Sequence, residues 1–556
     1  SHPPGNQVVP SPWQATTRFR FYFPSKEDGY QGRMFNPLTG AAGGTDDFFG
    51  GPYGEFMGGL CMCFRLGGYM VESNQGHIGN ALDHRFGEDP GLYGWVATTE
   101  AARLSKYIAA QIYGEGPHHS YVFGGSAGGR RSPLSLENAP DVWDGALPFM
   151  GAGDVGEPGN NERVQAAQAM SFATLLNVQR LLGDKVERVV DAMAAGGSGD
   201  PFAGLTTHQR EELASLYRQG FPRGDEHMIA EPWGQIWLWT SMADMLVADD
   251  PTYFDAFWTT PGYIGHDHPE LVANDLIDAQ CTVTRVLTLN DVMSEPAFAG
   301  PEYAPLHRAA LLALNMSDSE GITELPVAVE ISGVPSGYRL GCGVRPTTGK
   351  AAGRQLYAMA TVGDIFFCDA EGDASSQRFA GVEPGDKVHL DNHRFLAFCY
   401  YARHHAMADL QFDSLRVDGN SVYQQHPIPV MSSLMGNSYS GRFTGKLMWV
   451  HHTHDSEVWP PSALVYRDGV RNGLGESGMA ERYRIRWSEN AEHVPPMMIG
   501  ESLGRAGNTW LIDYLPIIEQ SMIDLVEWVE NGVDPAETTF EYRDGRVILP
   551  PTAKER

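Results

Sequence analysis

Ser126 is the residue of this chain whose surroundings best suit nucleophilic chemistry. It stands in the pattern Gly124-x-Ser126-x-Gly128, directly after the apolar run 121–123. Glycines at both flanks suit a sharp turn from a strand into a helix, because side chains there would clash where the backbone reverses and presents the serine hydroxyl. A chain with 64 glycines also produces this pattern by accident, so an ordinary Gly/Ser turn is the alternative interpretation.

An acid and a base follow Ser126 in the order that hydrolases with such a turn use. A serine hydroxyl needs an adjacent base, and the base needs an orienting acid. Asp455 follows the apolar run 446–450, and His493 follows the strand-like run 483–487. Both therefore stand on loops after strand candidates, in the order Ser, Asp, His. We interpret Ser126, Asp455 and His493 as a candidate catalytic triad.

Three neighbouring residues are alternatives to this acid and this base. Glu457 is the alternative acid, and His454 or His451 is the alternative base. Taken singly, a carboxylate after a strand is more often a helix cap, and a loop histidine is usually solvated. The triad prediction therefore depends on three residue types appearing together in the required order.

Backbone amides are also needed, because negative charge develops on the carbonyl oxygen of the substrate. One donor is expected from Ala127, the residue after the nucleophile. The other is expected from Gly76, at the end of the segment 69–76, since glycine allows close approach. The adjacent His77 either holds this loop beside the substrate pocket or is a surface residue.

A metal centre is a competing explanation for the histidines near Asp455. Metallo-hydrolases of the β-lactamase type use His-x-His-x-Asp-His, and His452-x-His454 begins such a pattern. Ser456 and Glu457 stand where that pattern requires aspartate and histidine, so no catalytic metal is expected, and a metal-dependent hydrolase is the third alternative for the function.

The acidic stretch 369–373 is a candidate for a structural calcium ion. It lacks the alternating oxygen ligands of a tuned calcium loop, and a solvated turn is the other interpretation. The proposed serine chemistry itself requires no cofactor.

The charge of the chain restricts its partners. Its 69 acidic and 40 basic residues give a formal net charge of -29, which repels phosphate backbones and anionic lipid headgroups. No apolar run approaches the roughly 18 residues that a spanning helix needs. We expect a soluble protein that binds neither nucleic acid nor membranes. The first residues contain neither the charged region nor the apolar region of a signal peptide, so export is not decided there.

The elements that must position the candidate site alternate as in an α/β fold. Strand, helix and strand are predicted over 69–71, 98–113 and 121–123, which implies parallel pairing through a crossover. The alternation of strands and helices returns after residue 440. A helix predicted over 515–531 carries one apolar stripe and ends before Gly532.

A long stretch interrupts this pattern. It reads as mostly helical to about residue 320, with helices predicted over 163–182, 184–195 and 207–218, and as β-rich from about 325 to 425. We therefore predict an α/β-hydrolase fold whose core comprises residues 1–150 and 441–556, with an inserted lid domain over 151–440.

Aromatic residues gather in the helical part of this insertion. Trp233, Trp237 and Trp258 stand there together with Trp239 and Phe257. Such clusters most often form the core of a lid. The functional alternative is that Trp233, Trp237 and Trp258 line an apolar pocket for an aromatic or otherwise bulky acyl group.

The chain resembles the tannase and feruloyl esterase family of serine esterases, which are α/β-hydrolases with a large lid inserted between the sheet strands. The matching segments are 73–77, 123–131, 139–145, 451–461 and 485–493, and 528–535 is similar to the family's closing helix. The resemblance covers residues 55–150 and 440–536. It implies an esterase that acts on small-molecule esters, and it favours a secreted or periplasmic location.

One departure from the family concerns the site directly. Family members typically carry one cysteine just before the nucleophile and another just after the catalytic histidine, and these form a bridge. Gly125 and Val494 occupy the two positions here, so the chain is an atypical member in which other contacts must hold Ser126 near His493.

Two functions of different classes follow from these patterns. The first is a serine carboxylic ester hydrolase, although the same triad also serves amide, thioester and acyl-transfer chemistry. The second is a ligand- or partner-binding protein on a hydrolase fold, which the missing cysteine pair favours. The separation of Ser126 and His493 would discriminate between them.

Overall fold

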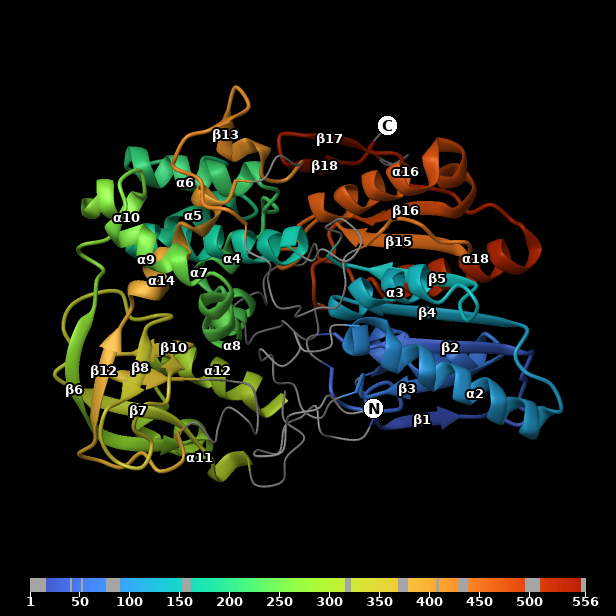
Figure 1. Ribbon diagram of the computed structural model, residues 1–556, viewed down its shortest axis with the longest axis horizontal. Helices are drawn as coiled ribbons and strands as arrows, with labels where there is room; N and C mark the ends of the chain where they lie inside the picture. Colours follow the sequence, from blue (N-terminus) through green and yellow to red (C-terminus); the bar gives the residue numbers. More distant parts are fainter. Residues whose placement is uncertain are drawn as a thin grey trace.

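The protein is built around a mostly parallel sheet of the α/β-hydrolase type (Figure 1). The computed structural model describes residues 17–40, 43–51, 54–76, 91–152, 162–315, 322–368, 379–406, 410–428, 439–495 and 511–551. Seven strands form this sheet, in the order β1 (Phe19–Tyr22), β3 (Gly68–Ser73), β2 (Arg33–Leu38), β4 (His119–Gly125), β5 (Gly145–Phe149), β15 (Lys446–His452) and β16 (Tyr483–Ser488).

The register of these strands brings distant loops to one edge of the sheet. β1 pairs antiparallel with β3, whereas all the other neighbours are parallel. Parallel strands end on the same side, so the loops after β2, β4, β15 and β16 leave together. This edge is therefore where residues from both ends of the chain can meet.

Helices cover both faces of the sheet because each buries one apolar stripe. One face packs against α2 (Ala97–Tyr113), α3 (Ala127–Asn138) and α16 (Pro461–Arg482). The other packs against α1 (Leu60–Arg65) and α18 (Leu515–Asn531). In α18 the stripe consists of buried Ile518, Met522 and Leu525, and Gly532 caps the helix at φ 68°, as predicted.

The long segment between β5 and β15 forms a second body with its own core. Its helices are α4 (Glu162–Leu182), α5 (Val186–Met193), α6 (Thr207–Arg218), α7 (His227–Ala230), α8 (Trp233–Asp249), α9 (Pro251–Thr259), α10 (Ile264–Asp267), α11 (Leu289–Ser294), α12 (Ala304–Asn315), α14 (His393–Cys399) and α15 (Tyr401–His404). The predicted helices over 163–182, 184–195 and 207–218 correspond to α4, α5 and α6.

A second seven-stranded sheet lies in this insertion. Its order is β10 (Ala360–Val362), β11 (Ile365–Phe367), β7 (Pro326–Ser332), β6 (Asp278–Thr288), β12 (Lys387–Asp391), β8 (Gly343–Pro346) and β9 (Leu356–Tyr357). β6 lies within the stretch that was predicted to be mostly helical. The reason is its β-branched and aliphatic content, which pairs with β7 on one side and β12 on the other.

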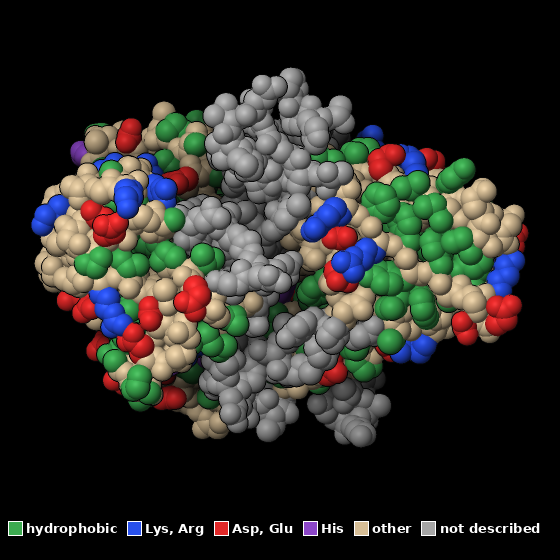
Figure 2. Space-filling model, turned by 90° about the horizontal axis from the view of Figure 1, so that it is seen from below, with side chains coloured by type: hydrophobic (Ala, Val, Ile, Leu, Met, Phe, Trp, Pro, Cys, Tyr) green, Lys and Arg blue, Asp and Glu red, His purple; other side chains and the backbone are tan. Residues whose placement is uncertain are grey.

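Two short hairpins complete the described strands. They are β13 (Arg416–Val417) with β14 (Asn420–Ser421), and β17 (Glu541–Arg543) with β18 (Arg546–Ile548). Among the helices of the described residues, none combines the length and the apolar character needed to cross a bilayer. On the face shown in Figure 2, Lys and Arg side chains lie interspersed with Asp and Glu.

The insertion packs against the edge where the loops of the first sheet meet. Its main apolar cluster includes Phe172 and Ile236 and extends to Tyr93 and Ala127, which belong to the hydrolase part. A second cluster joins α4, α5 and α6 to Trp459. The insertion thus contacts both the turn at Ser126 and the loop that carries Asp455.

Candidate active site

Ser126 occupies a strained turn between β4 and α3. Its backbone has φ 57° and ψ -122°, a conformation that non-glycine residues rarely adopt. A Cβ atom at Gly124 would lie 2.5 Å from the carbonyl oxygen of Leu38, and one at Gly128 would lie 2.1 Å from the same atom. Both glycines are therefore required by the approach of β2, which agrees with the steric reason inferred from the sequence. The Ser126 side chain is half-buried.

His493 and Asp455 form a direct buried pair. The Nδ1–H of His493 donates to Asp455, with Nδ1 2.9 Å from Oδ1 and 3.0 Å from Oδ2. Oδ1 also accepts the backbone N–H groups of Glu457, at 3.0 Å, and Val458, at 2.7 Å. The exposed fractions are 0% for Asp455 and 4% for His493. The Asp455 carboxylate is thus held by its own loop, and it orients the imidazole of His493 through Nδ1.

Electrostatics favour the charged forms of this pair. Burial raises the pKa of Asp455, but the charge of His493 and its hydrogen bond outweigh burial and lower that pKa below its usual value. Burial lowers the pKa of His493, but the charges of Asp455 and then Glu457 outweigh it and raise the pKa to about 9. The imidazole is consequently a stronger base than a free histidine.

The alternative acid lies at the other nitrogen of the same ring. Glu457 Oε2 is 3.6 Å from His493 Nε2, beyond a normal hydrogen bond but within reach of an ion pair. Asp455 and Glu457 therefore contact His493 on different atoms. Glu457 does not take the position of an acid that orients Nδ1.

The alternative bases are held by other partners. His451 Nε2 lies 3.0 Å from the carbonyl oxygen of Val458, and the Trp449 indole donates to His451 Nδ1 at 3.2 Å. His454 Nδ1 lies 3.1 Å from Thr453 Oγ1, and burial lowers the pKa of His454 to about 4. Neither histidine has the carboxylate contact that His493 makes in the described part of the chain.

Two groups of potential metal ligands occur among the described residues. Within the described ranges, three potential ligands converge at His118, His119 and Glu530, and at Asp278, His389 and Asp391. Both groups lie outside the loop of Asp455. The calcium candidate 369–373 lies outside the described residues, as does His77.

The loop after β2 lies against Ser126, and sequence reasoning missed it. A Cβ atom at Gly40 would lie 3.6 Å from Ser126 Cβ. The predicted donor, Gly76, has its N–H directed at Asn74 Oδ1 over 3.2 Å, and a Cβ there would meet Leu92. The glycines at 40, 43 and 44 after an apolar strand were the available signal.

A buried arginine ties this loop to the helix that Ser126 begins. Arg131 is 0% exposed; its guanidinium donates to the carbonyl of Thr39 and, through Nε at 3.2 Å, to that of Ala127. The guanidinium also lies 4.5 Å from the centre of the Tyr93 ring. Arg131 thereby fixes the carbonyl directly before Gly40 relative to Ala127, the other predicted oxyanion donor.

Side-chain packing connects the loop of Ser126 with the loop of His493, where family members typically have a cysteine bridge. A Cβ at Gly125 would lie 2.5 Å from both Met150 Cε and Phe149 Cε2, so a cysteine has no room there unless these side chains move. Tyr514 donates to the carbonyl oxygen of His493 at 3.0 Å, and its hydroxyl lies 3.8 Å from Met150 Sδ. Met150 and Tyr514 thus connect the residue before Ser126 with His493.

The three tryptophans that were predicted to line a pocket occupy different surroundings in the insertion. Trp233 begins α8 and is half-buried, next to Gly234, which packs on Glu457. Trp237 is only 6% exposed and belongs to the core of the insertion. Trp258 packs edge-on against His393 with ring centres 4.9 Å apart. Trp233 is the one among these three whose helix turn adjoins the acid loop, and the pocket role of all three stays a prediction.

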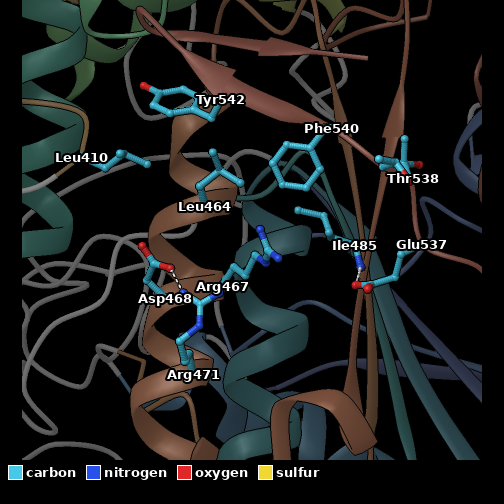
Figure 3. A pocket seen from close by; sticks show the side chains of 11 residues that line it. Leu410, Leu464, Arg467, Asp468, Arg471, Ile485, Glu537, Thr538, Phe540 and Tyr542 are labelled. Atoms are coloured by element: carbon cyan, nitrogen blue, oxygen red, sulfur yellow. Dashed lines mark hydrogen bonds and ion pairs between the residues drawn. The ribbon is translucent and has the colours of Figure 1, made fainter. Parts of the chain in front are cut away.

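A separate pocket of about 510 Å³ lies over α16 and the C-terminal segment (Figure 3). Arg467 lies in it with its guanidinium 5.2 Å from the centre of the Phe540 ring, and Arg471 pairs with Asp468. Its lining includes neither Ser126 nor His493. The pocket is therefore distinct from the candidate active site.

No family model and no curated protein matches the chain. Among solved structures, it is similar to feruloyl esterase B from Aspergillus oryzae, with 13% identity over 94% of this chain and 82% of that chain and a TM-score of 0.35. An esterase from Aspergillus oryzae shows 13% identity over 94% and 79%, with a TM-score of 0.37. Tannin acyl hydrolase from Aspergillus niger shows 12% identity over 94% and 77%, with a TM-score of 0.35. The α/β-hydrolase fold of this chain follows from its own sheet order and from the turn at Ser126.

Proposed function

We propose that this chain is a serine carboxylic ester hydrolase that works through an acyl-enzyme. The observation that carries the proposal is the buried His493–Asp455 pair, which lies beyond β15 and β16 at the sheet edge where β4 ends in the strained turn of Ser126. Strained backbone at a half-buried serine is typical of a functional site. An acid and a base at the same edge of the sheet would supply what a serine nucleophile needs.

The residues would act in the following roles. Ser126 Oγ attacks the ester carbonyl while His493 Nε2 accepts its proton, and Asp455 keeps the imidazole in the required tautomer. His493 then gives that proton to the departing alcohol oxygen. Water repeats the sequence on the acyl-enzyme and releases the acid.

The oxyanion would be stabilised by two backbone amides. Ala127 stands at the N-terminus of α3, where the helix dipole adds to its N–H. For the second donor we propose Gly40 in place of Gly76, because Gly40 adjoins Ser126 and the Gly76 N–H is directed at Asn74. None of these steps requires a cofactor.

Covalent labelling tests the nucleophile directly. A fluorophosphonate is expected to react with the protein at one site, because only an activated serine attacks such a reagent readily. Peptide mapping by mass spectrometry should place the adduct on Ser126. An adduct on another serine, or no adduct in folded protein, would contradict the proposal and favour a binding protein on this fold.

For the substrate we propose an ester with an aromatic or bulky apolar acyl group. Trp233 supports this class because it is half-buried at the end of α8 that adjoins the acid loop. Benzoyl and acetyl esters of one alcohol should differ in kcat/KM by about 10-fold or more in favour of benzoyl. The preference should shrink in Trp233→Ala, whereas an equal preference in both proteins would contradict the assignment.

A further inference from the structure

Glu457 is a second carboxylate on the imidazole of His493. Its Oε2 lies 3.6 Å from Nε2, while both oxygens of Asp455 lie near Nδ1. In the proposed function Nε2 is the atom that takes the proton of Ser126. Glu457 therefore lies beside the one position of the ring where proton transfer occurs.

The lid holds Glu457 in this position. A Cβ atom at Gly234 would lie 3.2 Å from the carboxyl carbon of Glu457, so the first turn of α8 packs directly on the carboxyl group. Gln235 Nε2 donates to the carbonyl oxygen of Ser456 at 3.1 Å and fastens the same turn to the acid loop. The N-terminus of a helix favours a negative charge next to it.

In the part of the chain that the structure describes, no other partner draws the Glu457 carboxylate away from His493. Its Oε1 is buried and makes no hydrogen bond within the described residues. Its backbone N–H donates to Asp455 Oδ1 at 3.0 Å, which fixes the start of the side chain. Burial raises the pKa of Glu457, and the charge of His493 opposes this rise. The cation nearest to the unsatisfied carboxylate is thus protonated His493.

Three other ionisable groups around the pair have pKa values that are shifted toward the neutral form. Glu492 is 1% exposed and accepts from Ser456 Oγ at 3.1 Å; burial, with the charges of Glu457 and Asp455, raises its pKa well above the usual value. Burial lowers the pKa of His451, and it lowers that of His452 to about 3.

Two further elements face the pair. Burial raises the pKa of Tyr514 far above its usual value, so this hydroxyl keeps its proton while it donates to the backbone carbonyl oxygen of His493. From the lid, α8 begins with Trp, Gly and Gln, which carry no ionisable group. The carboxylates that set the charge of His493 are thus Asp455 and Glu457.

We propose that Glu457 is a positioning residue that binds the imidazolium form of His493 at Nε2 and thereby opposes formation of the free base that Ser126 needs. This inference rests on the proposed function. In the free enzyme, His493 must lose its proton before it can accept one from Ser126, so each lowering of pH below the pKa of His493 removes active enzyme. Burial lowers that pKa, but the charges of the two carboxylates outweigh burial and place it at about 9.

The test is the pH profile of kcat/KM for an activated aryl ester in the unaltered protein and in Glu457→Gln. Glutamine keeps the shape of the side chain and removes its charge. The acidic limb should lie near the pKa of about 9 in the unaltered protein. It should move down by about one to two units in the variant, because an opposite charge at this range shifts a pKa by that amount. At pH 7 the variant should then be about ten- to fiftyfold more active than the unaltered protein.

Glu489→Gln is the matched control. Glu489 is exposed on the same loop as His493, so the substitution removes one equal charge away from Nε2 and should leave the limb in place. If the acidic limb of the pH profile does not move in Glu457→Gln, the inference is overturned. The proposed triad is not affected by that outcome. By contrast, undiminished turnover in Ser126→Ala would overturn the proposed function itself.

NMR titration of the His493 ring gives a readout independent of turnover. Its midpoint should fall in Glu457→Gln and stay constant in Glu489→Gln. If Glu457→Gln does not fold, Glu457→Asp replaces it, because the shorter side chain withdraws the carboxylate from Nε2. The midpoint of the His493 ring should then fall below that of the unaltered protein, and an unchanged midpoint overturns the inference.

Discussion

Ser126→Ala is expected to lower kcat for an activated aryl ester by about 10⁴-fold or more, because no other group can form the acyl-enzyme. Alanine keeps the Cβ atom at φ 57°, so the strained turn is unchanged and the melting temperature should stay close to that of the unaltered protein. Three measurements on the same preparation distinguish a loss of chemistry from a loss of folding. They are turnover, fluorophosphonate labelling and thermal unfolding.

Ser25→Ala is a suitable control for this experiment. Ser25 is exposed and bonds only to neighbouring Asp28 in the described residues, so its loss should leave turnover unchanged. Retained turnover in Ser126→Ala would reject the serine mechanism and leave the binding-protein alternative.

Asp455→Asn is expected to lower kcat by a similar factor of about 10⁴. The carboxylate accepts from His493 Nδ1 and from the backbone N–H groups of Glu457 and Val458. An amide has only one accepting oxygen, and its NH2 group facing Nδ1 would favour the wrong tautomer of His493. Steady-state kinetics together with labelling rates should show both reactions slowed, since both need the same base.

Asp468→Asn provides the comparison for a lost acid. Asp468 is exposed on α16, where it pairs with Arg471 outside the candidate site, and its loss should leave kcat unchanged. Full activity in Asp455→Asn would contradict the assignment of Asp455 as the orienting acid and would direct attention to Glu457.

Much of the fold was predictable because local patterns and tertiary packing agree. The run 121–123 lies within β4, the run 446–450 within β15, and the stripe of α18 is buried as its spacing indicated. β6 was not predicted, since an isolated strand of 11 residues inside a helical region becomes recognisable only through its two partner strands.

The sequence by itself determined the types and order of the candidate residues. Glycines around Ser126 require a particular turn, and strand-like runs before Asp455 and His493 place them on loops. These features are local, because steric clash at a turn and side-chain alternation along a strand depend on near neighbours.

Only the tertiary structure decided which groups contact which atoms. The choice of Asp455 for Nδ1 and Glu457 for Nε2, the approach of Gly40 to Ser126, and the replacement of a bridge by Met150 and Tyr514 all join residues distant in the chain. Parallel strands bring their loops to one edge whatever their separation in sequence, and packing there selects the partners. That selection depends on the distances between side chains, which no local pattern encodes.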